Sequence, residues 1–509
     1  MKDRSSFFIN GIFLTAVAVC ARAVGLAFNA YVSARVGAQG IGMYTLVTTV
    51  YGFALTFATA GISLTVTRLV ASAIGEGRER DIGRILRASA LYAAAFGATA
   101  SIVLWSLSLT LSVRVLGDAD LYVALRYLSL ALVPESLGAV FFGYFVGVRR
   151  VIGNAVTQIA AQAIKILLTT TCIARASADG AVAACICLSV VSLFSDGLAF
   201  FLQLVRFCID RIREKRKNAN NTLPLRVCMR SVAGMALPIG CSAYIRSALL
   251  TVEHALIPLC LQMRGESVEG SFASYGLLHA MTLPVLLFPM AALSSFASLL
   301  VPEYAEASAA KDSGRLSRIT ARAVRTTLTY AMLVSVLMAV FAEEIGYTLY
   351  GSYDVGYYLA RMAPVIPLMY LDHVTDSMLK GIGEHVYSMW VNISDACLSV
   401  LLVRLLIPRM GIGGYALVIV CMEGYNFLLS FLRLRRRIRF SLSVGSSVLL
   451  PLVTALGAAA LTKHVFCMNG ASTEPLWLWM QILFAACLCI GLLCLLHARY
   501  RPVREHRHR

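Results

Sequence analysis

Five basic residues interrupt long apolar segments of the sequence, where a charge is costly. They are Arg22, Arg126, Lys165, Arg246 and Arg361. An ionised side chain at the centre of a membrane-spanning helix costs roughly 2.5–3.5 kcal/mol on insertion scales, so it normally faces a partner or a water-filled cavity. A guanidinium group presents a planar fork of donors that can bind two phosphate oxygens at once. Arginines in these positions therefore indicate an anionic ligand.

Arg22 and Arg246 are the main substrate-binding candidates because they lie in corresponding helices of two repeated halves. We expect them to face one another across a central cleft, with Arg68 at its cytoplasmic entrance. Arg126 and Arg361 lie near outer helix ends, where an arginine can also pair with a buried acid or extend to a lipid headgroup. The same structural alternative stays open for Arg22 and Arg246.

Buried acids are the candidates for binding a coupling cation, as in many secondary transporters. Glu253 lies seven residues after Arg246, two helical turns along the same face. Asp372 and Asp376, one turn apart, form a second candidate site. The ion expected at either place is H⁺ or Na⁺.

Composition restricts the class of protein. Of the 509 residues, 59% are hydrophobic and 14% are charged, whereas roughly 25% are charged in an ordinary soluble domain. The mean hydropathy is +0.75. The sequence therefore predicts an all-α polytopic membrane protein, and it excludes a disordered chain, a nucleic-acid-binding domain and a small disulfide scaffold.

Fourteen apolar segments are long enough to cross a bilayer, which takes about 20 residues. The predicted helices cover residues 7–34, 41–66, 88–112, 121–147, 155–174, 181–205, 231–262, 272–301, 326–350, 356–379, 387–407, 411–432, 441–462 and 475–498.

The basic residues alternate between the two sides of the membrane. Every second connection is rich in Lys and Arg, with 33 on one side and 7 on the other. Such a bias marks the cytoplasmic side, so both termini are expected in the cytoplasm. The net charge of +18 thus reflects topology and membrane lipids, and we expect no nucleic-acid partner.

A pattern of an acid, a glycine at +1, a phenylalanine at +4 and an arginine at +10 occurs in two helices that are six apart. It begins at Asp196 and again at Glu423. Because six is even, the halves share one orientation, which predicts two six-helix lobes related by a parallel pseudo-repeat with substrate between them. The two acids, each beside a glycine, are expected to serve helix packing.

The repeat also sets the predicted domain limits, and two C-terminal helices lie outside it. We predict an N-lobe of helices 1–6 (1–210), a basic cytoplasmic linker (211–230), a C-lobe of helices 7–12 (231–433), helices 13 and 14 (434–498) and a basic cytoplasmic tail (499–509). Prolines concentrate in helices 7 and 8, and helix 7 is predicted to bend during transport.

Signatures of catalysis are missing from the sequence. It contains no Walker A, HExxH or GxSxG pattern and no cluster with metal-ligand spacing. The fourteen cysteines lack CxxC spacing and are expected to be small core residues. We therefore expect no catalytic residue, no metal, no cofactor and no enzymatic activity.

Several segments together resemble the stage V sporulation protein B-like oligosaccharide flippases. These belong to the multidrug/oligosaccharidyl-lipid/polysaccharide exporter superfamily and are related to lipid II flippases. The matching segments include Arg22-Ala-Val-Gly25, Gly40-Ile-Gly42-Met-Tyr44, Gly143-Tyr-Phe-Val-Gly147, Ser298-Leu-Leu-Val-Pro302 and Ile407-Pro-Arg-Met-Gly411.

The resemblance implies alternating access in a bacterial cytoplasmic membrane. The implied cargo is a lipid-linked sugar pyrophosphate, the undecaprenyl-linked peptidoglycan precursor, moved from the inner to the outer leaflet for cell-wall or spore-cortex synthesis. Arg22 stands where lipid II flippases have a required arginine. The chain departs from them at Phe28 and Asn29, where they carry a further Arg and an Asp, and at Ala161, where an acid is expected.

Two other functions remain open at this point. A cation-coupled multidrug exporter of the same superfamily would use buried acids to hold cationic drugs, whereas the arginines of helices 1 and 2 favour an anion. A membrane glycosyltransferase or polymerase needs a sizeable soluble loop with catalytic carboxylates, and the longest connections here have about 25 residues.

The charge bias predicts the topology. A green fluorescent protein fused after Arg509 should fluoresce, because it would remain in the cytoplasm, and alkaline phosphatase at the same place should be inactive. Fusions after Arg175, in a connection expected outside, should give the reverse result. Active phosphatase at the C-terminus would contradict the predicted orientation.

Overall fold

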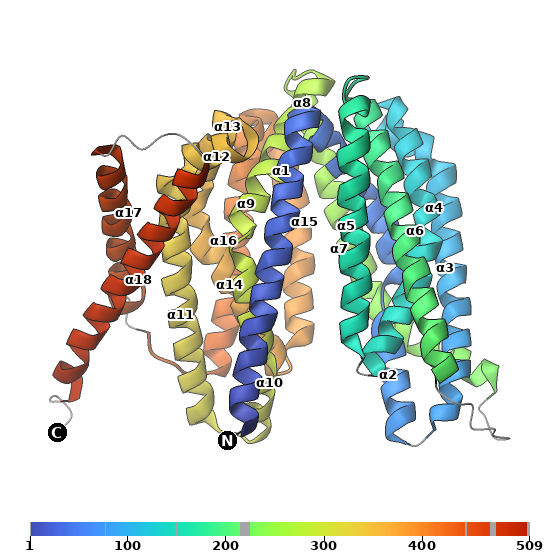
Figure 1. The fold of residues 1–509 in the computed structure, drawn as a ribbon, viewed down its shortest axis with the longest axis horizontal. Coiled ribbons are helices and arrows are strands. Elements are labelled where there is room, and N and C mark those ends of the chain that lie inside the picture. The colour runs from blue at the N-terminus through green and yellow to red at the C-terminus, as the bar shows by residue number, and fades with distance from the viewer. Residues whose placement is uncertain are drawn as a thin grey trace. The chain divides into compact units, whose positions relative to one another are not determined.

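The computed structural model describes the backbone of residues 2–76, 78–148, 150–213, 224–442, 445–468 and 475–505, and most side chains from Val19 to Leu493. These residues are almost entirely helical, and no β-strand occurs among them (Figure 1). Each of the fourteen predicted spans is helical over most of its described length. The predicted all-α membrane fold is therefore confirmed.

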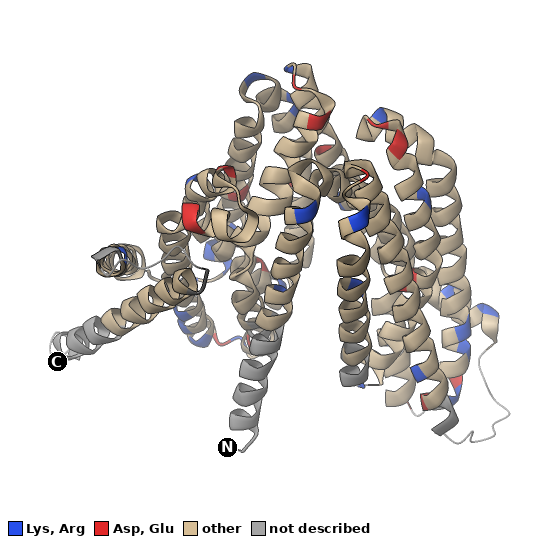
Figure 2. Ribbon diagram, turned by 45° about the horizontal axis from the view of Figure 1, so that its top comes forward, with Lys and Arg blue, Asp and Glu red and all other residues tan. Residues whose placement is uncertain are grey.

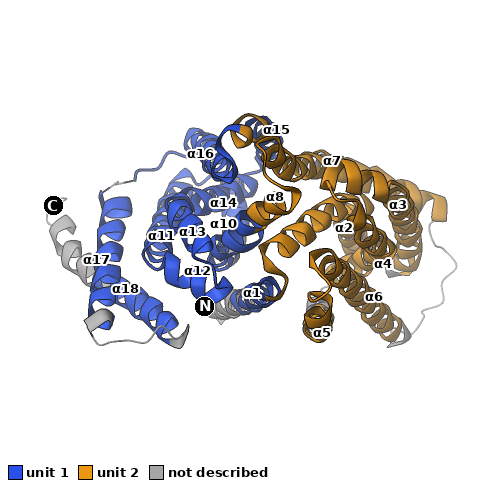
Figure 3. Ribbon diagram, turned by 90° about the horizontal axis from the view of Figure 1, so that it is seen from above, with its two compact units in different colours: residues 1–34, 277–402, 409–509 blue, residues 35–276, 403–408 orange. Residues whose placement is uncertain are grey.

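The helices form two compact units by contact (Figure 3). One unit, unit 2, holds residues 35–276 and 403–408, and the other, unit 1, holds residues 1–34, 277–402 and 409–509. The predicted lobes follow the sequence repeat, whereas these units follow contacts, so the first predicted span groups with the second half of the chain and helix 7 with the first.

The elements of unit 2 begin in the second part of α1. They are α1 (Lys2–Thr59), α2 (Ile62–Gly75), η1 (Glu79–Asp81), α3 (Ile82–Leu111), η2 (Ser112–Leu116), η3 (Ala119–Leu121), α4 (Tyr122–Gly147), α5 (Val151–Ala176), α6 (Ala181–Arg213), α7 (Leu225–Met263) and α8 (Val268–Tyr275). Buried side chains of α2, α3, α4 and α7, including Val66, Leu86, Tyr144 and Val232, form one apolar core.

Unit 1 contains the beginning of α1 and the later elements. They are η4 (Gly276–Thr282), α9 (Leu283–Leu287), α10 (Met290–Ala309), α11 (Ser313–Val340), α12 (Ala342–Tyr350), α13 (Tyr353–Met362), η5 (Ala363–Val365), α14 (Ile366–Gly381), α15 (His385–Met410), α16 (Ile412–Arg437), η6 (Gly445–Leu449), α17 (Leu450–Met468) and α18 (Pro475–Glu505). Helices α17 and α18 pack on one another and on α11.

Among the residues searched, eleven helices are long and apolar enough to cross a membrane. The first of them, Val19–Gly75, combines two predicted spans, which meet at the non-helical Gly37 (φ 74°). The fourteenth span is described as the shorter helix Trp477–Leu493. Many outward side chains, such as Phe194, Trp390 and Leu483, are apolar and exposed, and long stretches of helix carry no charge (Figure 2). Both features suit contact with lipid.

Several of the predicted spans are not single helices. The segment 41–66 turns at Gly61, whose φ of 79° and close approach to the Ala236 carbonyl leave no room for a side chain. The segment 272–301 contains a π-helix at 276–282 and breaks again before Pro289, which lacks a backbone donor. The segment 326–350 divides into α11 and α12 at Phe341.

Helix 7 was expected to bend, and its two prolines lie within the continuous helix α7. The bending itself stays a prediction. Of the basic linker predicted at 211–230, residues 214–223 lie outside the described part, while 225–230 already belong to α7. Residues 506–509 of the predicted tail also lie outside it.

The predicted repeat has a counterpart in helix packing. A Cβ at Gly147 of α4 would lie 3.0 Å from Val70 of α2, and a Cβ at Gly381 of α14 would lie 2.6 Å from Tyr304 of α10. Gly381 follows Gly147 by 234 positions, and Tyr304 follows Val70 by the same number. The two close contacts therefore have equivalent places in the repeat.

Both units also have an ion pair that ties the end of one helix to the turn before another. In unit 2, Arg150 pairs with Asp210 of α6, which also accepts a 3.0 Å hydrogen bond from the Tyr144 hydroxyl. In unit 1, Glu384 pairs with Arg433 (2.8 Å) and Arg437 of α16. We call these two ion-pair groups the unit 2 clamp and the unit 1 clamp. They have equivalent places in the repeat, but the residue in the turn is an arginine in unit 2 and an acid in unit 1.

Close backbone packing at Gly42 should make this residue intolerant of substitution. A Cβ there would lie 2.1 Å from the carbonyl oxygen of Phe272 on α8. We expect Gly42→Ala to lower the free energy of unfolding by about 1–3 kcal/mol, a typical cost of overpacking. Gly52→Ala, in the same helix with nothing within 4 Å, is the control in thermal unfolding of the purified protein in detergent. Equal stability of the two variants would contradict the packing.

The unit 1 clamp predicts a pH dependence of stability. Hydrogen bonding to Arg433, together with the charges of Arg433 and Arg437, lowers the pKa of Glu384 below its ordinary value. The stabilisation is therefore fully present above the ordinary Glu pKa of about 4.3 and is lost as the pH falls from there through the lowered pKa of the folded protein. We expect Glu384→Gln to cost about 1 kcal/mol at pH 7.5, a typical value for a partly exposed pair.

Thermal unfolding of the wild type and of Glu384→Gln across pH 3.5–7.5 checks this dependence. The difference between them should shrink as the pH falls. A difference that stays constant over this range would show that the carboxylate charge contributes nothing.

Candidate functional site

The three arginines predicted to bind substrate are all exposed. Arg22 lies on α1 in unit 1, while Arg68 on α2 and Arg246 on α7 lie in unit 2. Within the described part of the chain, no hydrogen bond or ion pair engages any of these guanidinium groups. Each fork of donors is therefore available to a ligand.

Arg68 and Arg246 lie at different depths of unit 2. The Ser247 hydroxyl donates to Thr56 at 3.2 Å, which fixes the level of Arg246 against α1. Arg68 lies on α2 between Val66 and Val70, which pack in one core with Val232 of α7. Arg246 is fourteen residues after Val232, or about 21 Å further along α7 at 1.5 Å per helical residue. The two groups are therefore too far apart to hold one small anion together.

The other two arginines within spans have partners. Arg126 lies over the rings of Trp105 and Tyr122, and its Nε donates to the Ser108 hydroxyl at 3.3 Å. Arg361 lies over the ring of Tyr357. Cation–π contacts of this kind stabilise a desolvated guanidinium, so both side chains have a structural explanation.

Two residues at which the chain departs from the lipid II flippase pattern, Asn29 and Ala161, form hydrogen bonds within their own unit. The Asn29 amide donates to the carbonyl of Ala280 at 2.7 Å, within unit 1. Ala161 is buried, and its carbonyl accepts a 3.1 Å bond from the Ser195 hydroxyl on α6. A longer acidic side chain at Ala161 would not fit this close approach of α5 and α6.

The acids predicted to bind a coupling ion are spread over both units. Glu253 is half-buried on α7, in unit 2, where it interacts electrostatically with Tyr275. The neighbouring His254 shares a 3.1 Å hydrogen bond with the Tyr275 hydroxyl. Glu253 is seven residues from Arg246, or about 10 Å along α7.

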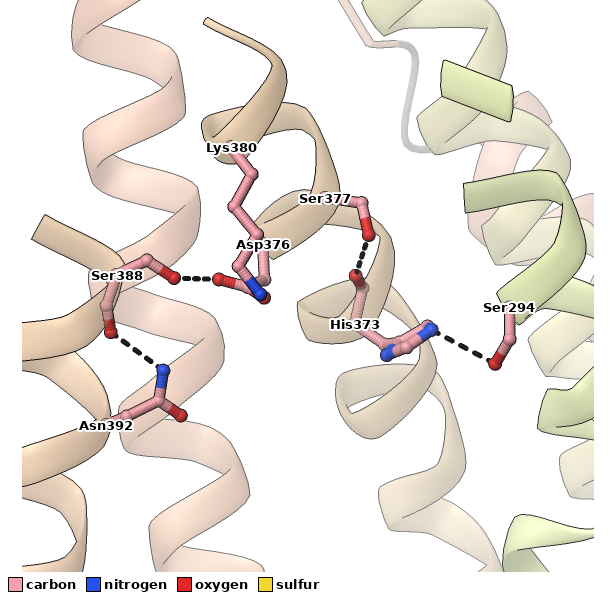
Figure 4. Close-up of polar contacts among 7 residues, drawn as sticks. All are labelled: Ser294, His373, Asp376, Ser377, Lys380, Ser388 and Asn392. Carbon is pink, nitrogen blue, oxygen red and sulfur yellow. Dashed lines mark hydrogen bonds and ion pairs between the residues drawn. The ribbon is translucent and has the colours of Figure 1, made fainter. Parts of the chain in front are cut away.

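The second predicted ion site lies on α14, and its residues point to different neighbours (Figure 4). Asp376 pairs with Lys380 and accepts a hydrogen bond from the hydroxyl of Ser388 on α15. His373, one turn before Ser377, instead shares a 3.1 Å hydrogen bond with Ser294 on α10. The structure therefore joins Asp376 to a cation of the chain itself.

Asp372 belongs to a separate group of acids in unit 1. It interacts electrostatically with Asp395 of α15 and Glu423 of α16, and its carboxylate meets the Ser430 hydroxyl. Its Oδ1 is buried and has no hydrogen-bond partner among the described residues. Asp372 therefore has acidic neighbours on α15 and α16, although no group of three or more His, Cys, Asp or Glu residues that could hold a metal occurs in the described part of the chain.

A cavity of ≈ 350 Å³ lies wholly within unit 2. Two acids, Glu135 of α4 and Asp196 of α6, line it together with Gln203. Asp196 was expected to serve helix packing, and the structure instead places it at a cavity. The sequence did not single out Gln203, although it follows Asp196 by seven residues, on the same face of α6.

These features define a multi-pass membrane protein of the transporter type, with a six-helix repeat and with some arginines on its spans that lack a partner in the described part of the chain. The chain belongs to the polysaccharide biosynthesis protein family, whose model matches residues 8–307. It is 21% identical over 426 residues to stage V sporulation protein B of Bacillus subtilis (strain 168). The aligned region covers 82% of this chain and 81% of that protein.

Solved structures with the same fold include transporters of two kinds. The lipid II flippase MurJ in an inward closed conformation matches with a TM-score of 0.69 and 13% identity, over 96% of this chain and 99% of that one. An inward-facing multidrug resistance MATE family transporter of the MOP superfamily matches with a TM-score of 0.65 and 15% identity, over 81% and 93%.

Proposed function

We propose that the protein is a flippase for lipid-linked oligosaccharide, with the undecaprenyl-pyrophosphate-linked peptidoglycan precursor as its cargo. The observation that carries the proposal is that Arg22 and Arg246 are exposed on apolar spans and have no partner among the residues that the structure describes. Retaining such charges costs free energy unless they serve a ligand. A pyrophosphate supplies two adjacent anionic groups that match the guanidinium forks.

The depths of the arginines fit a stepwise path for the pyrophosphate. Arg68, near the cytoplasmic end of α2, receives the anion first, and Arg246 of the same unit holds it deeper in the membrane. Arg22, which belongs to unit 1, is the third arginine that we propose to bind the anion. The polyprenyl tail stays in lipid throughout, so only the polar headgroup needs shelter from hydrocarbon. Transfer from the inner to the outer leaflet breaks no covalent bond, and the protein acts as a transporter and not as an enzyme.

The named relatives support this choice of cargo. Stage V sporulation protein B and a lipid II flippase are among the proteins it resembles, and the flippase match extends over 96% of the chain. The product would serve cell-wall or spore-cortex synthesis in a bacterial cytoplasmic membrane, with both termini in the cytoplasm.

We infer that a coupling cation, H⁺ or Na⁺, binds to acids on the spans. The candidates are Glu253, Asp372 and Asp376. Asp372 has the strongest support, because its buried Oδ1 lacks a partner and two further carboxyls lie near it. Asp376 already has Lys380 as its counter-ion, which makes a bound cation there less favourable.

A multidrug exporter is the alternative that the fold favours most, because a MATE transporter matches 81% of the chain. Such an exporter binds cationic drugs at acids. On the first spans, by contrast, the exposed charged side chains without a partner among the described residues are Arg22 and Arg68. Their positive charges would repel a cationic drug.

Substitution of the two arginines tests the proposed function. In cells that depend on this protein, Arg22→Ala and Arg246→Ala should each lower the labelling of precursor in the outer leaflet about tenfold or more, the effect expected when a charged hydrogen-bonded contact is lost. The lysine variants should recover only part of the activity, because an ammonium group cannot bind two oxygens as a planar fork.

Arg264→Ala is the matched control, since Arg264 is exposed at the end of α7, outside the helix. It should leave labelling unchanged. Normal precursor exposure in both alanine variants would remove these residues from the site. Altered drug accumulation with normal precursor exposure would instead favour the exporter.

A further inference from the structure

The cavity in unit 2 is large enough for an organic group. Its volume of ≈ 350 Å³ far exceeds the roughly 10–15 Å³ of such space that one water molecule needs. It also falls within the range of roughly 300–1,000 Å³ typical of small-molecule sites. A lone ion would leave most of this space unfilled.

Five helices contribute to the lining, and each supplies a polar group, with Ser63 of α2 among them. Glu135 of α4, Asp196 and Gln203 of α6, Gln158 of α5 and Thr59 of α1 all face the cavity. Phe142 of α4 and Phe200 of α6 add aromatic rings to the same lining. Carboxylates and amides beside aromatic rings suit a ligand that has hydroxyl groups on its edge and C–H groups on its faces.

One polar group in the cavity lacks a partner. Gln203 is 93% buried, since only 7% of its surface is exposed, and its Oε1 has no hydrogen-bond partner among the described residues. The same oxygen lies 3.3 Å from where a Cβ would stand at Gly138, another lining residue. A buried acceptor costs free energy when it is unpaired, so this oxygen indicates a ligand that donates a hydrogen bond.

A metal cation is a poor occupant for this cavity. Lys165 of α5 interacts electrostatically with both Glu135 and Asp196. Its positive charge opposes a second cation at the same carboxyls. No group of three or more His, Cys, Asp or Glu residues that could hold a metal is found among the residues searched. A neutral polyhydroxyl group meets neither difficulty, and lysine adds a donor for it.

The rim of the cavity is accessible. Phe142 is 36% exposed and Gln158 is exposed, whereas Gln203 lies deep within unit 2. A ligand can therefore enter past the rim and meet the unpaired amide oxygen at the base.

We propose that this cavity is a carbohydrate subsite that binds a sugar ring of the cargo through Glu135, Asp196 and Gln203. The proposal rests on the proposed function and deepens it, because it separates recognition of the sugar from recognition of the pyrophosphate by the arginines. Gln203 accepts a hydrogen bond from a sugar hydroxyl or acetamido N–H. The two carboxylates accept from further hydroxyls, and the phenylalanine rings pack on the faces of the ring.

Two lipids that differ only in the sugar provide the test. The full-length protein in lipid nanodiscs is titrated with undecaprenyl-pyrophosphoryl disaccharide and with undecaprenyl pyrophosphate. Gln203→Leu should weaken binding of the first about tenfold, as expected for a lost contact worth about 1.4 kcal/mol, and change the second less than twofold. Gln262→Leu is the matched control, because this glutamine of α7 bonds to Ser271 outside the cavity, and it should change neither.

A second variant guards against a folding defect. Glu135→Gln keeps the shape of the side chain and should weaken only the disaccharide lipid. Equal weakening of both lipids, or no weakening of either, in both variants would overturn the sugar subsite. Weakening of both lipids that follows Na⁺ concentration or pH would identify a cation site instead, which also overturns the proposal.

Failure of the proposed function is distinguishable from failure of the subsite. If the wild type binds neither lipid, the flippase proposal fails. The subsite is then decided with soluble N,N′-diacetylchitobiose, whose saturation-transfer NMR signal on the wild type should be lost in Gln203→Leu. The absence of a signal on the wild type would overturn it.

Discussion

The free-energy cost of placing a charge in hydrocarbon governs where the ionisable side chains of this protein lie. Most of them meet that cost locally: Arg126 lies between two aromatic rings, and Asp376 pairs with Lys380 one turn away. Arg22 and Arg246 do not, since both remain exposed without a partner in the described chain. This contrast, more than the fold, separates groups that hold the structure together from groups that we propose bind an anion.

The helical architecture could be predicted from the sequence because hydropathy and charge bias act over whole segments. All fourteen spans are helical, and the close contact of Gly147 with α2 recurs at Gly381 with α10. The breaks could not be predicted in the same way. The π-helix at 276–282 and the turn at Gly61 depend on which backbone lies opposite, as at Ala236, and no local sequence pattern reports a neighbour that is distant in the chain.

The candidate site was only partly accessible from sequence. Charged residues within spans stand out, so Arg22, Arg246 and Asp196 could be named, but their depths and neighbours could not. Asp196 was assigned to packing because its repeat partner Glu423 suggested a symmetric structural role. Gln203 carries no charge, and an amide in a helix gives little signal until five helices bring it beside the acids of one cavity.

The opposite charge order of the two clamps, Arg150 with Asp210 and Glu384 with Arg437, limits how the halves can be recombined. Asp210 lies on α6 beside Arg150, whereas Arg437 lies on α16 beside Glu384. A chimera that exchanged α6 and α16 would oppose like charges at both turns, arginine to arginine and acid to acid. A chain built by doubling either half would keep both pairs. The duplicated halves have thus diverged into modules that are no longer interchangeable helix by helix, even though their backbones follow one plan.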